Sequence, residues 1–183
     1  MSENKFEPNG VLIVNKPKGI TSHDVVGKIR KLYGTRKVGH TGTLDPLATG
    51  VLVILLGRAA KAAEYLVADR KAYIARLTLG LTTDTEDITG KILTQSNDIP
   101  TRDAVMIACG EFLGRIKQIP PMYSALKVDG KKLYDLAREG IEVERAARNI
   151  EIFRLDCTPT DKTNEYELYV ECSSGTYIRT LCA

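Results

Sequence analysis

The sequence predicts an α+β or mixed-sheet fold. Strand and helix patterns are interleaved along the 183 residues, but neighbouring strands are often joined by short turns and not by the helices of a regular βαβ array. The length fits one domain or two small ones. With 43% hydrophobic and 27% charged residues, the composition is that of a globular chain and argues against disorder.

The chain begins with a buried strand and an amphipathic helix. Residues 10–15 form the strand pattern, and a turn follows at residues 16–19. Ser22 is the expected N-cap of a helix whose apolar residues recur at helical spacing up to Tyr33. Gly34 stands where a C-cap glycine belongs.

A glycine-rich loop then leads into a strand–helix–strand region. Residues 34–50 contain four glycines and one proline, so neither a helix nor a strand is expected there. The following patterns predict a buried strand over 51–56, an Ala-rich helix over 58–67 and a strand over 72–80.

The second half of the chain alternates loops with short elements. The expected elements are an acidic loop at 81–90, a helix at 101–113, a strand at 122–128, a short helix at 131–139, strands at 150–155 and 166–172, and a helix from Gly175. The stretch 114–148 is long and irregular for a connection, which indicates an inserted functional loop.

The charge of the chain does not by itself identify a binding partner. The net charge is +3, but residues 1–70 hold 11 Lys and Arg against 6 Asp and Glu, and residues 113–148 hold 8 against 5. Two interpretations of the basic segments stay open, a polyanion-binding surface and ordinary solvated faces.

The chain has no segment that could cross a membrane. Its longest apolar run has six residues, whereas a membrane span needs about 20. The N-terminal MSENKFEPNG lacks the apolar stretch of a signal peptide, which predicts a cytosolic protein without a membrane partner.

Histidine and cysteine are too scarce for a common metal centre. The chain has two His and four Cys, and no C-x-x-C pair. No zinc site is therefore predicted, and the cysteines are expected to be reduced core residues. Any chemistry must depend on carboxylates, tyrosines and arginines.

One carboxylate stands out. Asp45 lies between glycines and directly before Pro46, which favours an extended backbone at Asp45. It is either an Asx-turn residue or a carboxylate presented to a substrate, where it could act as nucleophile or base without a metal or cofactor. Nucleotide-binding fingerprints are absent, and the consecutive Ser22, His23 and Asp24 cannot face one another as a triad.

The segment around Asp45 resembles the signature of the TruB family of tRNA pseudouridine synthases. Residues 39–50 read GHTGTLDPLATG. Further matches follow in order along the chain: GVL…NKP…G…TS at 10–22, KAY at 71–73, G…TDT…D…G at 80–90, QIPPMYSALK at 118–127 and CSSGTYIRTL at 172–181.

The resemblance implies a fold and a reaction. The fold would be the pseudouridine synthase fold, a mixed, mostly antiparallel sheet flanked by helices with an inserted RNA-gripping loop. The reaction would convert uridine 55 in the T loop of tRNA to pseudouridine without cofactor or metal. The substrate would be the T stem-loop, and its target uridine would be flipped out so that the enzyme can reach it. The Pro-Leu-Ala-Thr-Gly ending resembles bacterial stand-alone members, so a monomer without a guide RNA is expected.

The resemblance also assigns site residues. Asp45 would be the catalytic carboxylate, by a route that the sequence leaves open, and Arg179 would be the arginine that pairs with it. Tyr73 would pack against the target base, and Tyr177 would line the same pocket. His40 would contact the RNA near the flipped uridine.

Several lysines are further candidates for RNA contact. Lys16 and Lys61 would contact phosphates or make local structural contacts. Residues 119–148 correspond to the family's mobile insertion, in which Lys127 and Lys132 contribute positive charge.

The chain ends four residues after Arg179, where family members continue. Residues 1–183 are therefore expected to be a catalytic domain shortened at its C-terminal end, without the C-terminal RNA-binding domain. Two other functions stay open: an RNA-binding module without turnover, and a carboxylate-dependent nucleoside hydrolase that would release uracil.

Overall fold

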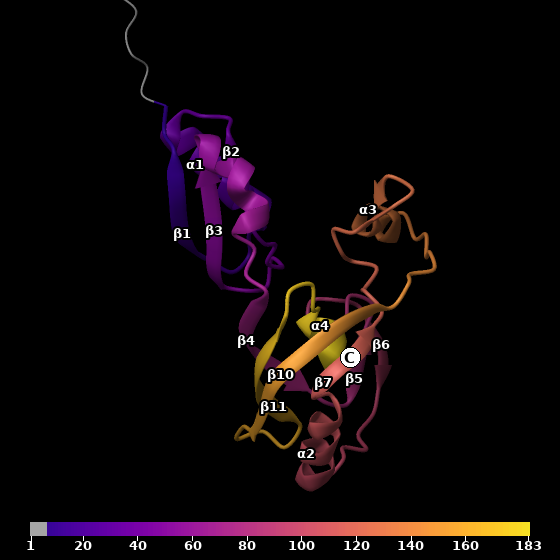
Figure 1. Ribbon diagram of the computed structural model, residues 1–183. Helices are drawn as coiled ribbons and strands as arrows, with labels where there is room; N and C mark the ends of the chain where they lie inside the picture. The colour runs from indigo at the N-terminus through magenta and orange to yellow at the C-terminus, as the bar shows by residue number, and fades with distance from the viewer. Residues whose placement is uncertain (1–6) are drawn as a thin grey trace, which may run out of the picture. The chain divides into compact units, whose positions relative to one another are not determined.

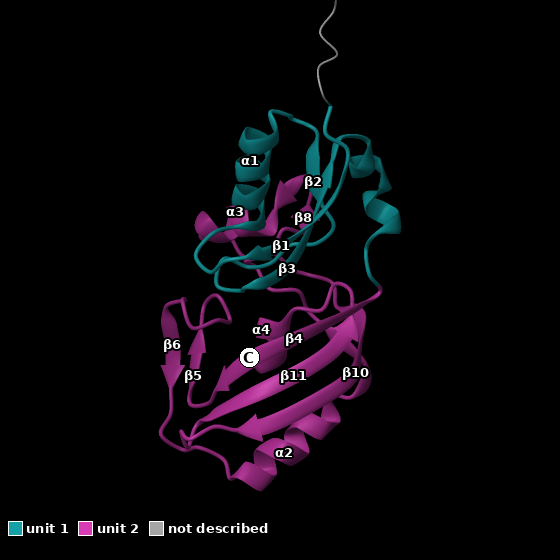
Figure 2. Cartoon of the chain, turned by 90° about the vertical axis from the view of Figure 1, so that its left-hand side faces the viewer, with its two compact units in different colours: residues 1–68 teal, residues 69–183 magenta. Residues whose placement is uncertain are grey.

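The computed structural model describes residues 7–183, which divide into two compact units, unit 1 up to residue 68 and unit 2 from residue 69 to residue 183 (Figure 2). Residues 1–6 lie outside the described residues. They belong to the N-terminal segment that lacks the apolar stretch of a signal peptide. No helix among the described residues is long and apolar enough to cross a membrane.

Unit 1 is a small antiparallel sheet with a helix on one face (Figure 1). Its elements are β1 (Gly10–Lys16), α1 (Ser22–Tyr33), β2 (Val38–His40), β3 (Gly50–Leu56) and the 3₁₀ helix η1 (Gly57–Tyr65), with the strands in the order β1-β3-β2. The core between α1 and the sheet consists of Val25, Val26, Val38, Leu52, Ile54 and Leu56.

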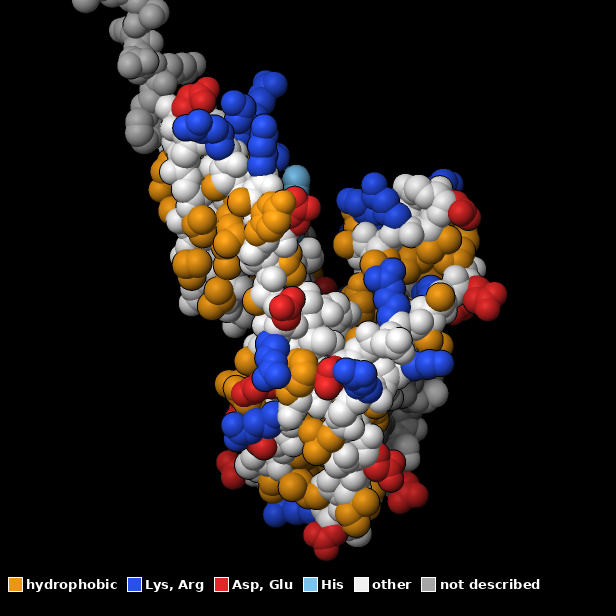
Figure 3. All heavy atoms as spheres, viewed as in Figure 1, with side chains coloured by type: hydrophobic (Ala, Val, Ile, Leu, Met, Phe, Trp, Pro, Cys, Tyr) orange, Lys and Arg blue, Asp and Glu red, His pale blue; other side chains and the backbone are white. Residues whose placement is uncertain are grey.

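The opposite face of the same sheet exposes apolar side chains. Strand residues alternate between faces, so Val11 and Ile13 point away from α1. Val11, Ile13 and Val51 are 48%, 68% and 70% exposed, and hydrophobic side chains are visible over β1 and β3 in Figure 3.

Helix α1 confirms its predicted end but corrects its predicted start. Gly34 has a left-handed φ of 63° and caps the C-terminus. The N-cap is Thr21, and not Ser22 as predicted. Thr21 and Asp24 form a capping box, because each side chain bonds the other's backbone N–H. Hydrogen bonds from Thr21 hold the pKa of Asp24 below its ordinary value.

Two further predictions for unit 1 need correction. The loop 34–50 was expected to hold no strand, but Val38–His40 pairs with the end of β3. The Ala-rich segment is helical, as predicted, but adopts a 3₁₀ helix over Gly57–Tyr65. Helix propensity indicates that a segment is helical and does not by itself fix the spacing of its hydrogen bonds.

Unit 2 is built on a four-stranded antiparallel sheet in the order β4-β11-β10-β7. The strands are β4 (Arg70–Thr78), β7 (Gly114–Gln118), β10 (Arg148–Pro159) and β11 (Glu165–Ser173). Helix α2 (Arg102–Glu111) packs on β10, and α4 (Ile178–Cys182) contributes Leu181 to the same core (Figure 2). The observed elements confirm the α+β class.

The remaining elements of unit 2 are short. A hairpin of β5 (Leu81–Thr83) and β6 (Ile92–Gln95) carries the acidic loop, which was predicted without its strands. Strand β7 lies in a stretch predicted to be irregular. The strand expected over 122–128 is reduced to β8 (Lys127–Val128), which pairs with β9 (Lys131–Lys132) before α3 (Leu133–Arg138).

The four cysteines are free thiols that belong to the core of unit 2 or pack against it, as expected. Cys157 is buried, and this burial together with the neighbouring Cys109 raises the pKa of its thiol to about 12. Burial also raises the pKa of Cys182 to about 11.

Candidate functional site

The loop that carries Asp45 is fixed on both sides by hydrogen bonds within unit 1. The hydroxyl of Ser22 accepts from the Leu44 amide at 2.9 Å and lies 3.2 Å from the Leu44 carbonyl, to which it donates. The Pro46 carbonyl accepts from the Gly19 amide at 2.8 Å. Asp45 itself is half-buried, so its carboxyl group sits on a backbone held at the preceding and following residues.

The Asp45 backbone also closes a tight turn. Its carbonyl accepts from the Ala48 amide at 3.0 Å, which is the hydrogen bond of a β-turn.

The position at which α1 begins explains why the Ser22 side chain reaches the loop. Since Thr21 is the N-cap, Ser22 lies in the first turn of α1 and its buried hydroxyl is available to Leu44.

Lys16 lies beneath this loop and is completely buried. Its ammonium donates to the carbonyls of Pro17 and Ile20 at 2.9 and 2.8 Å, and lies 3.4 Å from the Pro46 carbonyl. Burial lowers the pKa of Lys16, and the negative charge of Asp45 opposes that shift. Of its two predicted roles, the structure shows the local contacts, so Lys16 is not assigned to a phosphate.

His40 and Lys61 lie elsewhere in unit 1. His40 is the last residue of β2, opposite Ile54, and is half-buried. Its Nδ1 atom is buried without a hydrogen-bond partner among the described residues. Lys61 is an exposed residue of η1.

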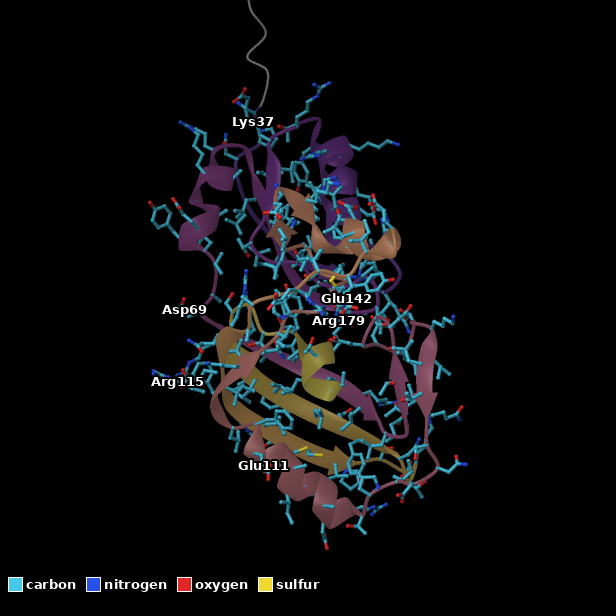
Figure 4. All side chains as sticks on the ribbon, turned by 90° about the vertical axis from the view of Figure 1, so that its right-hand side faces the viewer. Lys37, Asp69, Glu111, Arg115, Glu142 and Arg179 are labelled. Atoms are coloured by element: carbon cyan, nitrogen blue, oxygen red, sulfur yellow. The ribbon has the colours of Figure 1, made fainter. Side chains whose placement is uncertain are left out.

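Exposed basic side chains gather at one end of unit 1 (Figure 3), and Lys37 is labelled there in Figure 4. Helix α1 and the turn after it carry four exposed basic residues: Lys28, Lys31, Arg36 and Lys37. The first basic segment of the sequence is therefore a solvent-accessible surface.

In unit 2, two backbone carbonyls hold the guanidinium of Arg179. Nη1 donates to the Thr85 carbonyl at 3.2 Å, and Nη2 donates to the Tyr123 carbonyl at 2.6 Å. Arg179 lies at the upper end of α4 in Figure 4. The arginine is thus oriented by the hairpin loop after β5 and by the segment after β7.

The loop that supplies Thr85 is itself tightly organised around Asp87. The Asp87 carboxylate accepts from the amide and the hydroxyl of Thr89 and from the Thr85 hydroxyl. Glu86 adopts a left-handed φ of 60°, and a Cβ at Gly90 would collide with the Thr85 side chain. Burial raises the pKa of Asp87, but the bonds from Thr89 and Thr85 and the charge of Arg179 outweigh it, so that the net shift is downward.

Tyr177 is fixed through its backbone. The buried side chain of Gln118 donates to the Tyr177 carbonyl at 3.0 Å and accepts from the Tyr177 amide at 2.8 Å. One turn of α4 later, the Thr180 hydroxyl donates to the Glu86 carboxylate. The start of α4 is therefore tied to β7 and to the hairpin loop.

Tyr73 occupies the middle of β4, opposite Val170 of β11. It is half-buried and packs against the core of unit 2. The strand thus holds the ring at the boundary between core and solvent.

The lysines of the insertion differ in their surroundings. Lys127 is exposed. Lys132 donates to the Tyr134 hydroxyl at 2.9 Å, which raises the pKa of its ammonium, and Arg138 lies 5.4 Å from the centre of the Tyr134 ring. Two cations therefore flank one aromatic ring in this segment.

The predicted site residues fall on both units. Unit 1 holds Asp45, Lys16, His40 and Lys61, and unit 2 holds Tyr73, Tyr177, Arg179, Lys127 and Lys132. Within the described part of the chain, no group of three or more His, Cys, Asp or Glu side chains is arranged to hold a metal ion.

Sequence reasoning missed the residues that support the site: Ser22, Thr85, Gln118 and Tyr123. All four stand inside the quoted family motifs. The motifs thus contain a signal for them, but nothing that identifies their partners.

The comparisons with known proteins define the class. Residues 30–178 match the family described as "TruB family pseudouridylate synthase (N terminal domain)". Since the match covers most of the sequence, the chain belongs to this family.

Particular relatives carry a more specific name. The chain is 52% identical over 174 residues to tRNA pseudouridine synthase B of Alkaliphilus oremlandii, covering 95% of this chain and 58% of that protein. It is 53% identical over 176 residues to tRNA pseudouridine synthase B of Syntrophotalea carbinolica, covering 95% and 57%. The chain thus spans a little over half the length of these relatives.

Solved structures show the same fold. A chain of a Cbf5–Nop10–Gar1 complex superposes with a TM-score of 0.68 and 29% identity, over 94% of this chain and 42% of that chain. A chain of an H/ACA RNP bound to a substrate RNA containing 2′-deoxyuridine gives 0.66 and 26%, over 94% and 40%. The pseudouridine synthase fold predicted from the motifs is confirmed.

Proposed function

We propose that this chain is the catalytic part of a tRNA pseudouridine synthase that isomerises uridine 55 of the T loop. Family membership and relatives of about 50% identity named tRNA pseudouridine synthase B support the reaction class. The observation that carries the proposal is the Asp45 loop, held at Leu44 by Ser22 and at Pro46 by Gly19 and Lys16. A preorganised carboxylate of this kind suits chemistry at a sugar-bound base.

The reaction is an isomerisation and balances without a co-reactant. The N1–C1′ glycosidic bond of uridine breaks, the uracil turns within the site, and a C5–C1′ bond forms. The proton lost from C5 is matched by one gained at N1. Asp45 is the catalytic carboxylate in this proposal, Arg179 belongs to the catalytic group, and Tyr73 packs against the base.

RNA binding is assigned to further side chains of both units. His40 contacts the RNA near the flipped nucleotide, and Tyr177 lines the base pocket. Lys61, Lys127 and Lys132 supply positive charge to the tRNA backbone, with residues 119–148 as the gripping insertion. In this proposal the enzyme is a cytosolic monomer that needs no guide RNA, and the chain is more similar to the relatives named tRNA pseudouridine synthase B than to the Cbf5-type chains.

The test compares Asp45→Ala with the wild type and with Asp98→Ala, a matched change at an exposed carboxylate. Each protein is incubated with a T stem-loop transcript, and pseudouridine is detected by carbodiimide-dependent primer stops. We expect the wild type and Asp98→Ala to form pseudouridine at one position. Asp45→Ala should be slower by at least roughly 10²- to 10⁴-fold, the usual contribution of a positioned catalytic group.

Two outcomes would replace the proposal. A wild type that forms no pseudouridine, with a variant that binds the transcript equally well, would indicate an RNA-binding module. Release of free uracil in the same assay would indicate a nucleoside hydrolase.

A further inference from the structure

Gln118 makes an unusual contact for a side chain at the end of a strand. It is the last residue of β7 and only 8% exposed. Its amide group forms two hydrogen bonds with the backbone of Tyr177, which lies 59 residues further along the chain. Because a Gln amide both donates and accepts, it pairs with the N–H and the C=O of one residue as a neighbouring strand would.

The backbone of Tyr177 lies at the start of α4 and is held by hydrogen bonds from outside that helix. Tyr177 has an extended backbone, with φ −99° and ψ 108°, and no side chain caps the helix that follows it. The direction in which α4 starts therefore depends on the groups that hold Tyr177.

The same segment also holds Arg179. Nη2 of Arg179 donates to the carbonyl of Tyr123, five positions after Gln118. Between them, Pro120 and Pro121 are both buried, and proline restricts φ. Residues 118–123 thus contact Tyr177 at one end and Arg179 at the other.

We propose that Gln118 is a positioning residue that sets the backbone of Tyr177, and through it the directions of the Tyr177 ring and of Arg179. The inference rests on the proposed function, in which these two residues belong to the site. Gln118 itself touches no substrate.

The test uses Gln118→Met, which keeps much of the side-chain volume but loses both hydrogen bonds. The matched control is Asn164→Leu, since the Asn164 amide also bonds a distant backbone carbonyl, that of Leu79, at 3.1 Å. Turnover and KM are measured on a T stem-loop transcript at a temperature where both variants are folded. Exchange of the Tyr177 amide proton is followed by NMR.

We expect Gln118→Met to lower kcat about 10- to 100-fold with KM changed less than about threefold, since small misplacements of reacting groups cost this much. Protection of the Tyr177 amide should be lost. Asn164→Leu should keep the kcat of the wild type. If both variants lose activity in proportion to their loss of stability, Gln118 has only a structural role and the inference is overturned.

The exchange experiment separates this inference from the proposed function. A wild type without activity would refute the function alone. In that case, unchanged protection at Tyr177 and an unchanged Arg179 Nε–H resonance in Gln118→Met would overturn the positioning role. Changes at both positions would support it.

Discussion

At the scale of single residues, the position of Asp45 is set by neighbours to which no catalytic role is assigned. Ser22 and Gly19 hold the adjacent peptide groups, and Lys16 fills the space beneath the loop. A buried lysine whose ammonium is surrounded by carbonyls has its hydrogen bonds satisfied, which offsets part of the cost of burying a charge.

Ser22→Ala tests the support at Leu44. The change leaves the amide of the half-buried Leu44 without its side-chain acceptor, and loss of an acceptor costs up to about 1–3 kcal/mol. We expect the free energy of unfolding to fall by this amount in urea titrations followed by circular dichroism. Ser174→Ala, an exposed serine, is the control. Equal stability of the two variants would show that the Ser22 hydroxyl does not support the loop.

The sequence singled out the proposed catalytic residue, Asp45, but not the contacts that surround it. Asp45 and Arg179 were located through motifs that resemble a family, and the glycine-rich loop alone left Asp45 as a possible turn residue. The burial of Lys16 and the pairing of Gln118 could not be predicted, because each depends on partners up to 59 residues away.

At the scale of elements, short-range sequence patterns predicted those strands and helix ends that depend mainly on neighbouring residues. Alternating apolar residues located β4 and β11, and Gly34 marked the end of α1. Strands β5, β6 and β7 were missed, because short strands are stabilised by partners that lie elsewhere in the sequence.

The loop between β5 and β6 offers a prediction about pH. The pKa of Asp87 is lowered in the folded protein, so its ionised form stabilises the fold above the ordinary Asp pKa of about 3.9, and this contribution is lost as the pH falls through the lowered value. We therefore expect Asp87→Asn to be less stable than the wild type at pH 6, and the difference to shrink below about pH 4.

Urea unfolding between pH 2.5 and 7 measures this difference directly. Asp98→Asn removes a carboxylate from the exposed segment after β6 and is the matched control. A stability difference between the wild type and Asp87→Asn that stays constant over the whole range would contradict the prediction.

At the scale of the whole molecule, the chain consists of two units joined at residues 68 and 69. The length allowed one domain or two small ones, and it did not locate a boundary. The segment before the junction is exposed to solvent: Tyr65, Leu66 and Val67 are 81%, 43% and 40% exposed.

Limited proteolysis should therefore begin at this junction. We expect the first cuts by chymotrypsin after Tyr65 or Leu66, because exposed segments outside regular elements are the usual sites of nicking. Mass spectrometry would then find fragments 1–65 or 1–66 with their complements. The double variant Tyr65→Ser, Leu66→Ser should delay both cuts. First cuts within residues 119–148 would show that the insertion, and not the junction, is the most accessible segment.

The supports of Asp45 also have a consequence for the order of events during synthesis. Lys16, Gly19 and Ser22 precede the loop in the chain, and β3, which anchors it in the sheet, ends at Leu56. The hydrogen bonds that Lys16, Gly19 and Ser22 make to the loop can therefore form before the ribosome has translated any residue of unit 2. The backbone that presents the carboxylate can form while the segment bearing Arg179 is still unmade.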